Sequence, residues 1–209
     1  MFQMIQALER RMLMSVTADT LTADVQTVYA DARVAAVANS AYLATIHHDI
    51  VAIAAGLRHA DTKANRFENN KLLAALEHNG TFYNAKVAAG VNGLLATAKY
   101  VAVVGAANGK YLLKHPTSAA YQKFLANDVA YANANVPAWL NDVEAELIDS
   151  SNAIATDLDL IADLNPTVST AVSSFESDLA TKPTALVTAA AQVQTDTTQL
   201  TSDLGAIPT

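Results

Sequence analysis

The histidines of this sequence are the residues best suited to binding a metal ion or a haem group. His47 and His48 are adjacent, but successive helical residues point about 100° apart, so the two cannot easily bind one ion. His59 follows His48 by eleven residues, or about 16 Å along a helix. A ligand from another helix, such as His78 or His115, would have to complete any site. We therefore expect solvent-facing or interfacial histidines, and we predict no metal and no cofactor.

The acidic residues are numerous, but their spacing does not match known carboxylate metal sites. Di-metal bundles use Glu-x-x-His on two helices, and no glutamate of this chain has a histidine three residues later. Calcium loops need glycine at the sixth position, whereas the runs that begin at Asp142 and Asp157 have Leu147 and Ala162 there. We interpret both runs as the acidic faces of helices.

No short motif points to catalysis. The chain has no cysteine, and it lacks Gly-x-Ser-x-Gly, a phosphate-binding glycine loop and His-Glu-x-x-His. We predict that the protein is not an enzyme and has no catalytic residues. An enzyme with an unrecognised site stays open as an alternative, because catalytic groups are defined in space rather than in sequence.

Seven tyrosines and Trp139 allow two interpretations. An alanine-rich bundle needs a few large residues to fill its core, and we favour this role for them. In the alternative, they line a pocket between helices, and the protein is a small-molecule binder or sensor. A closed cavity of more than about 300 Å³ lined by Tyr and His would favour that alternative.

The composition is that of an all-helical protein. Apolar residues make up 52% of the 209 residues, and 43 residues are alanine, the best helix former. Glycine (7) and proline (5) are scarce. Apolar residues recur every three or four positions, and between Leu186 and Leu204 the steps alternate between four and three, which is the heptad spacing of coiled coils.

The charge is unevenly distributed. The net charge is −7, and the stretch after residue 115 contains twelve Asp or Glu but only two basic residues, Lys123 and Lys182. An acidic, lysine-poor surface repels phosphates and anionic lipid headgroups. We therefore expect no nucleic-acid partner and find no strong membrane signal, whereas a protein partner or self-association stays possible.

These patterns predict an all-α fold, an elongated antiparallel helical bundle of about five to seven helices with an alanine-rich core. Residues 1–17 form a leader or sorting segment, 18–135 an N-terminal helical part and 136–209 an acidic C-terminal helical part, the last two in one continuous bundle. We expect Thr17 or Asp19 to cap the first long helix. Further helix boundaries are expected at Gly80, Pro116, Pro137, Pro166 and Pro183.

Residues 82–114 allow three interpretations. The stretch is nearly uncharged and rich in glycine, which favours a buried central helix whose Gly90 and Gly93 permit close packing. The Asn108-Gly109 pair favours a β-hairpin. The apolar length would also suit a membrane span, although Asn92 and Lys99 lie within it.

The N-terminal stretch "ALERRMLMSV" differs from the rest of the chain. Its apolar run is too short for a secretory or a twin-arginine export signal. The stretch resembles the LEPR-XLL motif found near the N-terminus of planctomycete-type surface proteins. Arg10 stands where that motif has proline, and the matching residues are Leu8, Glu9, Arg11, Leu13 and Ser15. An ordinary helix end is the alternative.

The resemblance implies sorting for export or to the cell surface of a bacterium. Together with the missing catalytic motifs, it predicts a non-catalytic exported or cell-surface-associated helical protein that acts as a structural or interaction module. The small-molecule binder and the enzyme with an unrecognised site are the two alternatives.

Overall fold

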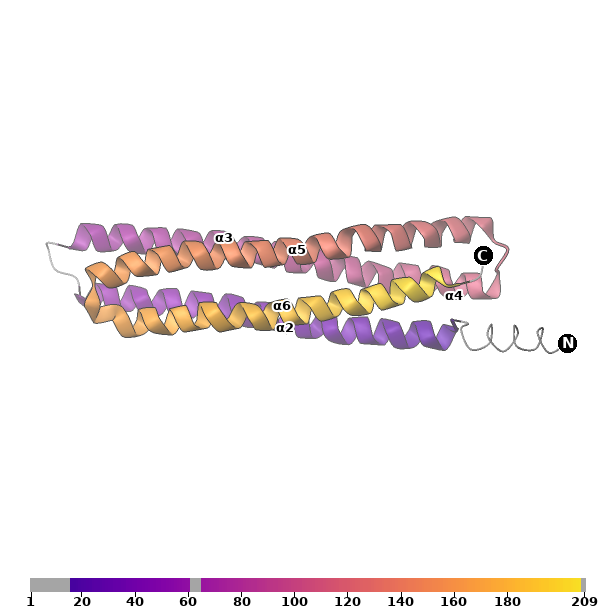
Figure 1. Cartoon of the computed structure of the whole chain (residues 1–209), viewed down its shortest axis with the longest axis horizontal. Helices are drawn as coiled ribbons and strands as arrows, with labels where there is room; N and C mark the ends of the chain where they lie inside the picture. Colours follow the sequence, from indigo (N-terminus) through magenta and orange to yellow (C-terminus); the bar gives the residue numbers. More distant parts are fainter. Residues whose placement is uncertain (1–15, 61–64, 208–209) are drawn as a thin grey trace, which may run out of the picture. The chain divides into compact units, whose positions relative to one another are not determined.

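The computed structural model describes residues 16–60 and 65–207, and its architecture is an all-α antiparallel bundle of four long helices (Figure 1). The long helices are α2 (Ala18–Ala60), α3 (Arg66–Tyr100), α5 (Ala119–Leu164) and α6 (Ser169–Gly205). A π turn, η1 (Val101–Gly105), and the short α4 (Ala106–Lys114) continue α3, and the 3₁₀ turn η2 (Pro166–Val168) precedes α6. The all-α prediction is confirmed, but the expected number of helices was too high.

The described residues divide into two compact units, and each long helix contributes to both. The first unit combines segments from within Met1–Arg33, Leu94–Ala138 and Gln192–Thr209. The second unit combines Val34–Gly93 and Trp139–Ala191. Every contact described below joins residues of the same unit.

Two prolines that were expected to begin new helices lie inside long ones. Pro137 is within α5 and Pro183 is within α6. An internal proline removes one backbone hydrogen bond and costs about 3 kcal/mol. Burial of apolar neighbours on both sides offsets that cost: Val136 and Leu140 are buried near Pro137, and α6 buries Leu179 and Leu186 on either side of Pro183. The helix breaks predicted at these two prolines account for part of the error in the predicted number of helices.

Gly80 was expected to end a helix, and it instead lies in the middle of α3. A glycine that ends a helix has a positive φ angle, and no glycine in the described part of the chain has one. A Cβ atom on Gly80 would collide with Cδ1 of Ile50 on α2. Gly80 therefore lies at a close contact between α2 and α3 in the second unit, where the flexible end of Ile50 occupies the space that a side chain would take.

Three further helix boundaries agree with the predicted signals. Thr17 caps α2, because its Oγ1 accepts a hydrogen bond from the backbone N–H of Thr20 at 3.1 Å. The helical run ends at Lys114, just before Pro116. Asn165 and Pro166 begin the turn that leads into α6.

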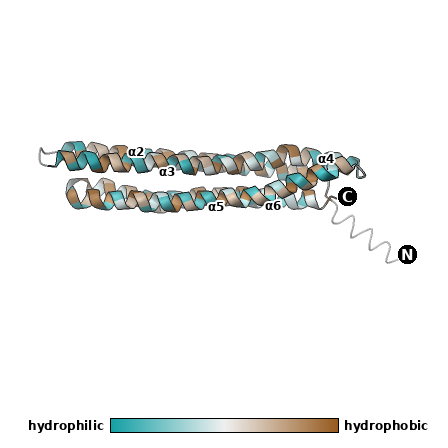
Figure 2. Cartoon of the chain, turned by 90° about the horizontal axis from the view of Figure 1, so that it is seen from above, coloured by the Kyte–Doolittle hydropathy of each residue, from teal (hydrophilic) through white to brown (hydrophobic). Residues whose placement is uncertain are grey.

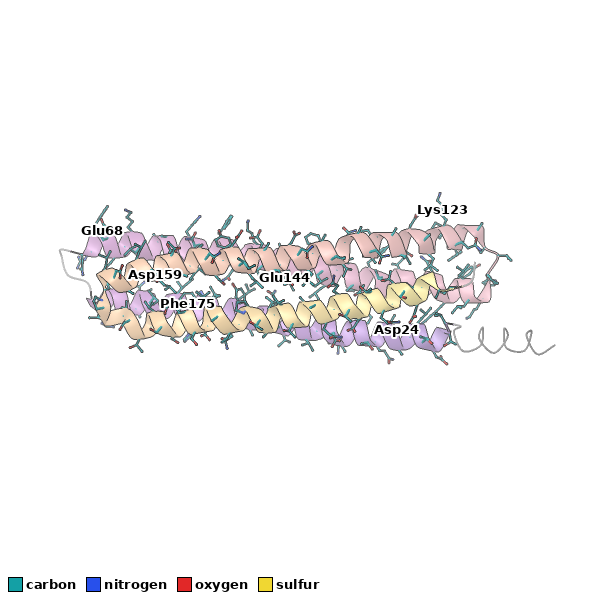
Figure 3. All side chains as sticks on the ribbon, in the orientation of Figure 1. Asp24, Glu68, Lys123, Glu144, Asp159 and Phe175 are labelled. Carbon is teal, nitrogen blue, oxygen red and sulfur yellow. The ribbon has the colours of Figure 1, made fainter. Side chains whose placement is uncertain are left out.

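The predicted apolar seams form the core of each unit, with hydrophobic and hydrophilic residues alternating along every helix (Figure 2). The heptad positions predicted on α6 are all fully buried: Leu186, Ala190, Val193, Thr197, Leu200 and Leu204. Phe175, which is labelled in Figure 3, is fully buried as well. The tyrosines differ from the expectation, since Tyr42 is the one that is buried while Tyr100, Tyr111 and Tyr131 are partly exposed.

Residues 82–114 are helical throughout, so the β-hairpin interpretation is wrong. Gly109 does not form a turn and lies against Leu204 and Leu21 in the first unit, where a Cβ atom would come within 2.6 Å of Leu204. The helical run Arg66–Lys114 is long and apolar enough to cross a membrane, and 44% of its most apolar stretch is buried within the protein. Core helices of folded proteins meet the same criterion.

Candidate functional site

The residues singled out as possible metal ligands do not come together. All five histidines are exposed, and no group of three His, Asp or Glu side chains able to hold a metal ion occurs within residues 16–60 and 65–207. His48 contacts the neighbouring Asp49, with Nδ1 and Oδ1 3.2 Å apart. The predicted sorting residues, Leu8 to Ser15, lie outside the described residues.

Asp128 is a buried carboxylate of the first unit that accepts hydrogen bonds from two side chains. It lies on α5 and is only 4% exposed. Tyr100 donates its hydroxyl hydrogen to Oδ1 at 2.6 Å, and Asn108 donates from Nδ2 to Oδ2 at 2.7 Å. Asp128 therefore accepts two hydrogen bonds from neutral side chains across the interface between helices.

The π turn η1 explains how two residues eight positions apart reach the same carboxylate. In a regular α-helix, a separation of eight residues leaves the side chains about 80° out of line. The wider π turn rotates less per residue, and it lies between Tyr100 and Asn108. The two donors are thereby brought to one face of the helical run.

The hydrogen bond to Asp128 raises the pKa of Tyr100, and burial and the nearby negative charge of Asp128 act in the same direction. Tyr100 thus stays a protonated donor and is poorly suited to act as a base. Both donors are already occupied by one carboxylate. This arrangement fits a brace between helices better than a reaction centre.

An aromatic cluster lies beside the turn between α4 and α5 in the first unit. The rings of Tyr111 and Tyr121 are stacked with centroids 3.8 Å apart, and His115 lies 4.4 Å from Tyr111. Phe124 meets Tyr121 edge to face at 5.6 Å. The cluster is partly exposed and makes contacts across the turn, so these rings join two helix ends rather than fill a core.

Polar contacts in the second unit also join helices. Asn79 on α3 donates to Asp157 on α5 at 2.8 Å, and the hydroxyls of Tyr42 and Ser150 lie 3.1 Å apart. Burial raises the pKa of Tyr42. Asp157 was expected on a solvent-facing side and is instead buried. It lies three residues after the buried Ile154 and four before the buried Ile161, and this helical spacing is the signal that could have shown it.

Three carboxyl groups of α2 face carboxyl groups of α6, a feature that the sequence analysis missed. The pairs are Asp24 with Asp203 and Asp31 with Asp196 in the first unit, and Asp49 with Asp178 in the second. Burial, together with the facing carboxyl group, raises the pKa of Asp24 and of Asp196 to about 6. Burial also raises the pKa of Asp49, although the hydrogen bond to His48 opposes this.

A groove with a volume of about 480 Å³ lies between α5 and α6 in the second unit. Ile148 on its rim is 61% exposed. The groove is lined mainly by aliphatic and hydroxyl side chains with one carboxylate, Glu144, which is labelled in Figure 3. It contains no tyrosine or histidine, so it differs from the pocket described for the small-molecule alternative.

Comparison of the chain with protein-family models, with curated proteins and with solved structures gives no match.

Proposed function

We propose that this protein is a non-catalytic helical module, exported or associated with the cell surface, that acts by binding another protein or as a structural element. The observation that supports this most is the use of its buried polar side chains. Asp128, Asp157 and Tyr42 are bonded to side chains of neighbouring helices within their own unit. Polar side chains whose hydrogen bonds already join helices are not available to bind and activate a substrate.

We place the interaction surface at the groove between α5 and α6 in the second unit. Part of its lining is aliphatic: Leu147, Ile148, Leu179, Pro183 and Val187. The neighbouring part of α5, residues 139–164, contains seven Asp or Glu and no Lys or Arg. An apolar groove beside a row of carboxylates suits an amphipathic helix whose apolar face is flanked by lysine or arginine.

A synthetic amphipathic peptide with a leucine face and lysine flanks tests this surface. We expect saturable binding by fluorescence anisotropy, and about tenfold weaker binding to the Ile148→Ser variant because one apolar contact is lost. Val51→Ser is the matched control, since Val51 is also an exposed aliphatic residue of the second unit (52% exposed) and does not line the groove. Equal weakening by both variants, or equal binding of a peptide with glutamate flanks, would refute the assignment.

The proposed localisation depends on the resemblance of residues 7–16 to the LEPR-XLL motif, and a separate experiment tests it. The full chain and a chain lacking residues 2–16 are expressed in a planctomycete host and fractionated. We expect the full chain in the envelope or medium and the shortened chain in the cytosol. The same distribution for both chains would reduce residues 2–16 to an ordinary helix end.

A further inference from the structure

The three carboxyl pairs between α2 and α6 share a single register. Seven residues separate Asp24 from Asp31 on α2 and Asp196 from Asp203 on α6. Eighteen residues, or about five helical turns, separate Asp31 from Asp49 and equally Asp178 from Asp196. Each pair thus occupies the corresponding position of an antiparallel contact, and the arrangement is found in both units.

One oxygen atom in each pair is buried and has no hydrogen-bond donor. These oxygens are Oδ2 of Asp24, Oδ2 of Asp196 and Oδ2 of Asp49. Two ionised carboxylates cannot donate to each other, and a buried acceptor without a donor is unfavourable. A proton on one carboxyl group of each pair supplies the missing donor and removes the like-charge repulsion.

The charged and polar groups beside the pairs differ between the two units. Asp203 is the charged group that acts on Asp24, and Asp196 is affected by Asp31 and by the neutral amide of Gln192. In the second unit, His48 contacts Asp49. Lys182, on α6, lies 3.9 Å from Asp178. The two pairs of the first unit are therefore the least compensated.

We propose that the contact between α2 and α6 is a proton-dependent interlock, in which each of three facing aspartate pairs closes by sharing one proton and loosens when both members ionise. The interlock makes this helix pair tighter in mildly acidic surroundings than in neutral ones. It does not depend on the proposed partner or on the proposed location of the protein.

The direction of the pH effect follows from the raised pKa values. An aspartate of the unfolded chain titrates near pH 3.9, whereas Asp24 and Asp196 titrate near pH 6 in the folded protein. Between these values the folded state holds more protons than the unfolded state, so stability falls as the pH rises. The contribution is complete below about pH 4 and is lost as the pH rises through 6.

Thermal unfolding of the full chain at pH 5 and pH 8 measures this dependence. We expect the wild-type Tm to be about 5 °C higher at pH 5. The triple variant Asp24→Asn, Asp49→Asn, Asp196→Asn replaces one member of each pair with an amide, which donates to the remaining carboxylate at any pH. We expect this variant to lose at least half of the pH dependence and to exceed the wild-type Tm at pH 8.

The control variant Asp142→Asn, Asp159→Asn, Asp163→Asn removes the same number of charges from exposed positions on α5. Equal loss of pH dependence in both triple variants would assign the effect to net charge and overturn the interlock. A rise in the wild-type Tm with CaCl₂ at pH 8 that the paired variant lacks would assign the pairs to a cation, again overturning it.

Carbon-13 NMR titration of the wild-type aspartate carboxyl groups provides a measurement that needs no variant to fold. We expect two or more of the paired aspartates to titrate near pH 6. Titration of every aspartate below pH 5 would show that no pair retains a proton in mildly acidic solution, and the proposal would be abandoned.

Discussion

The α5 helix meets α3 and α4 through matched polar groups, whereas α6 meets α2 through carboxyl groups that face each other. On α5, Asp128 accepts hydrogen bonds from Tyr100 and Asn108 in the first unit, and Asp157 accepts one from Asn79 in the second. On α6, the aspartates at corresponding positions meet aspartates of α2. Aspartates therefore accept hydrogen bonds in the contacts of α5, whereas they face other carboxyl groups in the contact between α2 and α6.

The difference shows that an interfacial aspartate has no fixed effect on stability. A carboxylate that accepts hydrogen bonds stabilises the fold in its ionised form, and removing it leaves its donors unpaired. A carboxylate that faces another stabilises the fold only when one of the two is protonated. Replacing a single aspartate should therefore change stability in opposite directions in the two contacts at neutral pH.

Asp128→Ala is the substitution with the largest expected effect. It leaves the hydroxyl of Tyr100 and the amide of Asn108 without their acceptor, and it empties a buried position. We expect the free energy of unfolding to fall by about 2–4 kcal/mol, measured by urea denaturation. Asp142→Ala, at an exposed position of the same helix, is the control and should stay within about 0.5 kcal/mol of wild type. Equal effects would show that Asp128 is not a brace.

The helical class and much of the core could be predicted from the sequence because they depend on local periodicity. The α6 seam from Leu186 to Leu204 was predicted by counting apolar steps, and Thr17 was one of two residues predicted as the cap from their type. Helix number was misjudged because Gly80, Pro137 and Pro183 are usually stop or start signals. Whether such a residue ends a helix depends on what packs against it, as Ile50 does at Gly80, and that is a tertiary property.

The polar contacts were harder to predict for the same reason. Asp157 and Asp159 are two residues apart in one acidic run, yet Asp157 is buried against Asn79 and Asp159 is exposed. The facing of Asp24 and Asp203 depends on the register of two helices that are far apart in sequence. Residue spacing shows that a helix has a polar position at an interface, but not which residue the partner helix presents there.

A pair of single substitutions at pH 8 tests the opposite signs directly. Asp157→Asn weakens a hydrogen bond to a charged acceptor, and we expect a loss of about 0.5–1.5 kcal/mol. Asp24→Asn removes one of two facing charges and supplies a donor to Asp203, and we expect the Tm to rise by about 1–3 °C. Differential scanning calorimetry at pH 8 measures both.

The same two variants at pH 5 serve as the control. Asp24 of the wild-type protein is largely protonated there, so the advantage of Asp24→Asn should disappear, whereas the loss in Asp157→Asn should persist. A fall in Tm for both variants at pH 8 would show that the contacts of α5 and α6 do not differ in the way described above.

Glu146→Gln is expected to have the smallest effect, although it breaks the shortest ion pair described between α3 and α5. Lys86 lies 2.9 Å from Glu146, and the hydrogen bond raises the pKa of Lys86. Both side chains are accessible to water, which screens the attraction, so we expect the Tm to change by less than about 2 °C and to converge with wild type in 1 M NaCl. A larger, salt-resistant loss would mean that charge pairing itself holds α3 to α5. In that case, satisfaction of buried acceptors would no longer explain the contrast with α2 and α6.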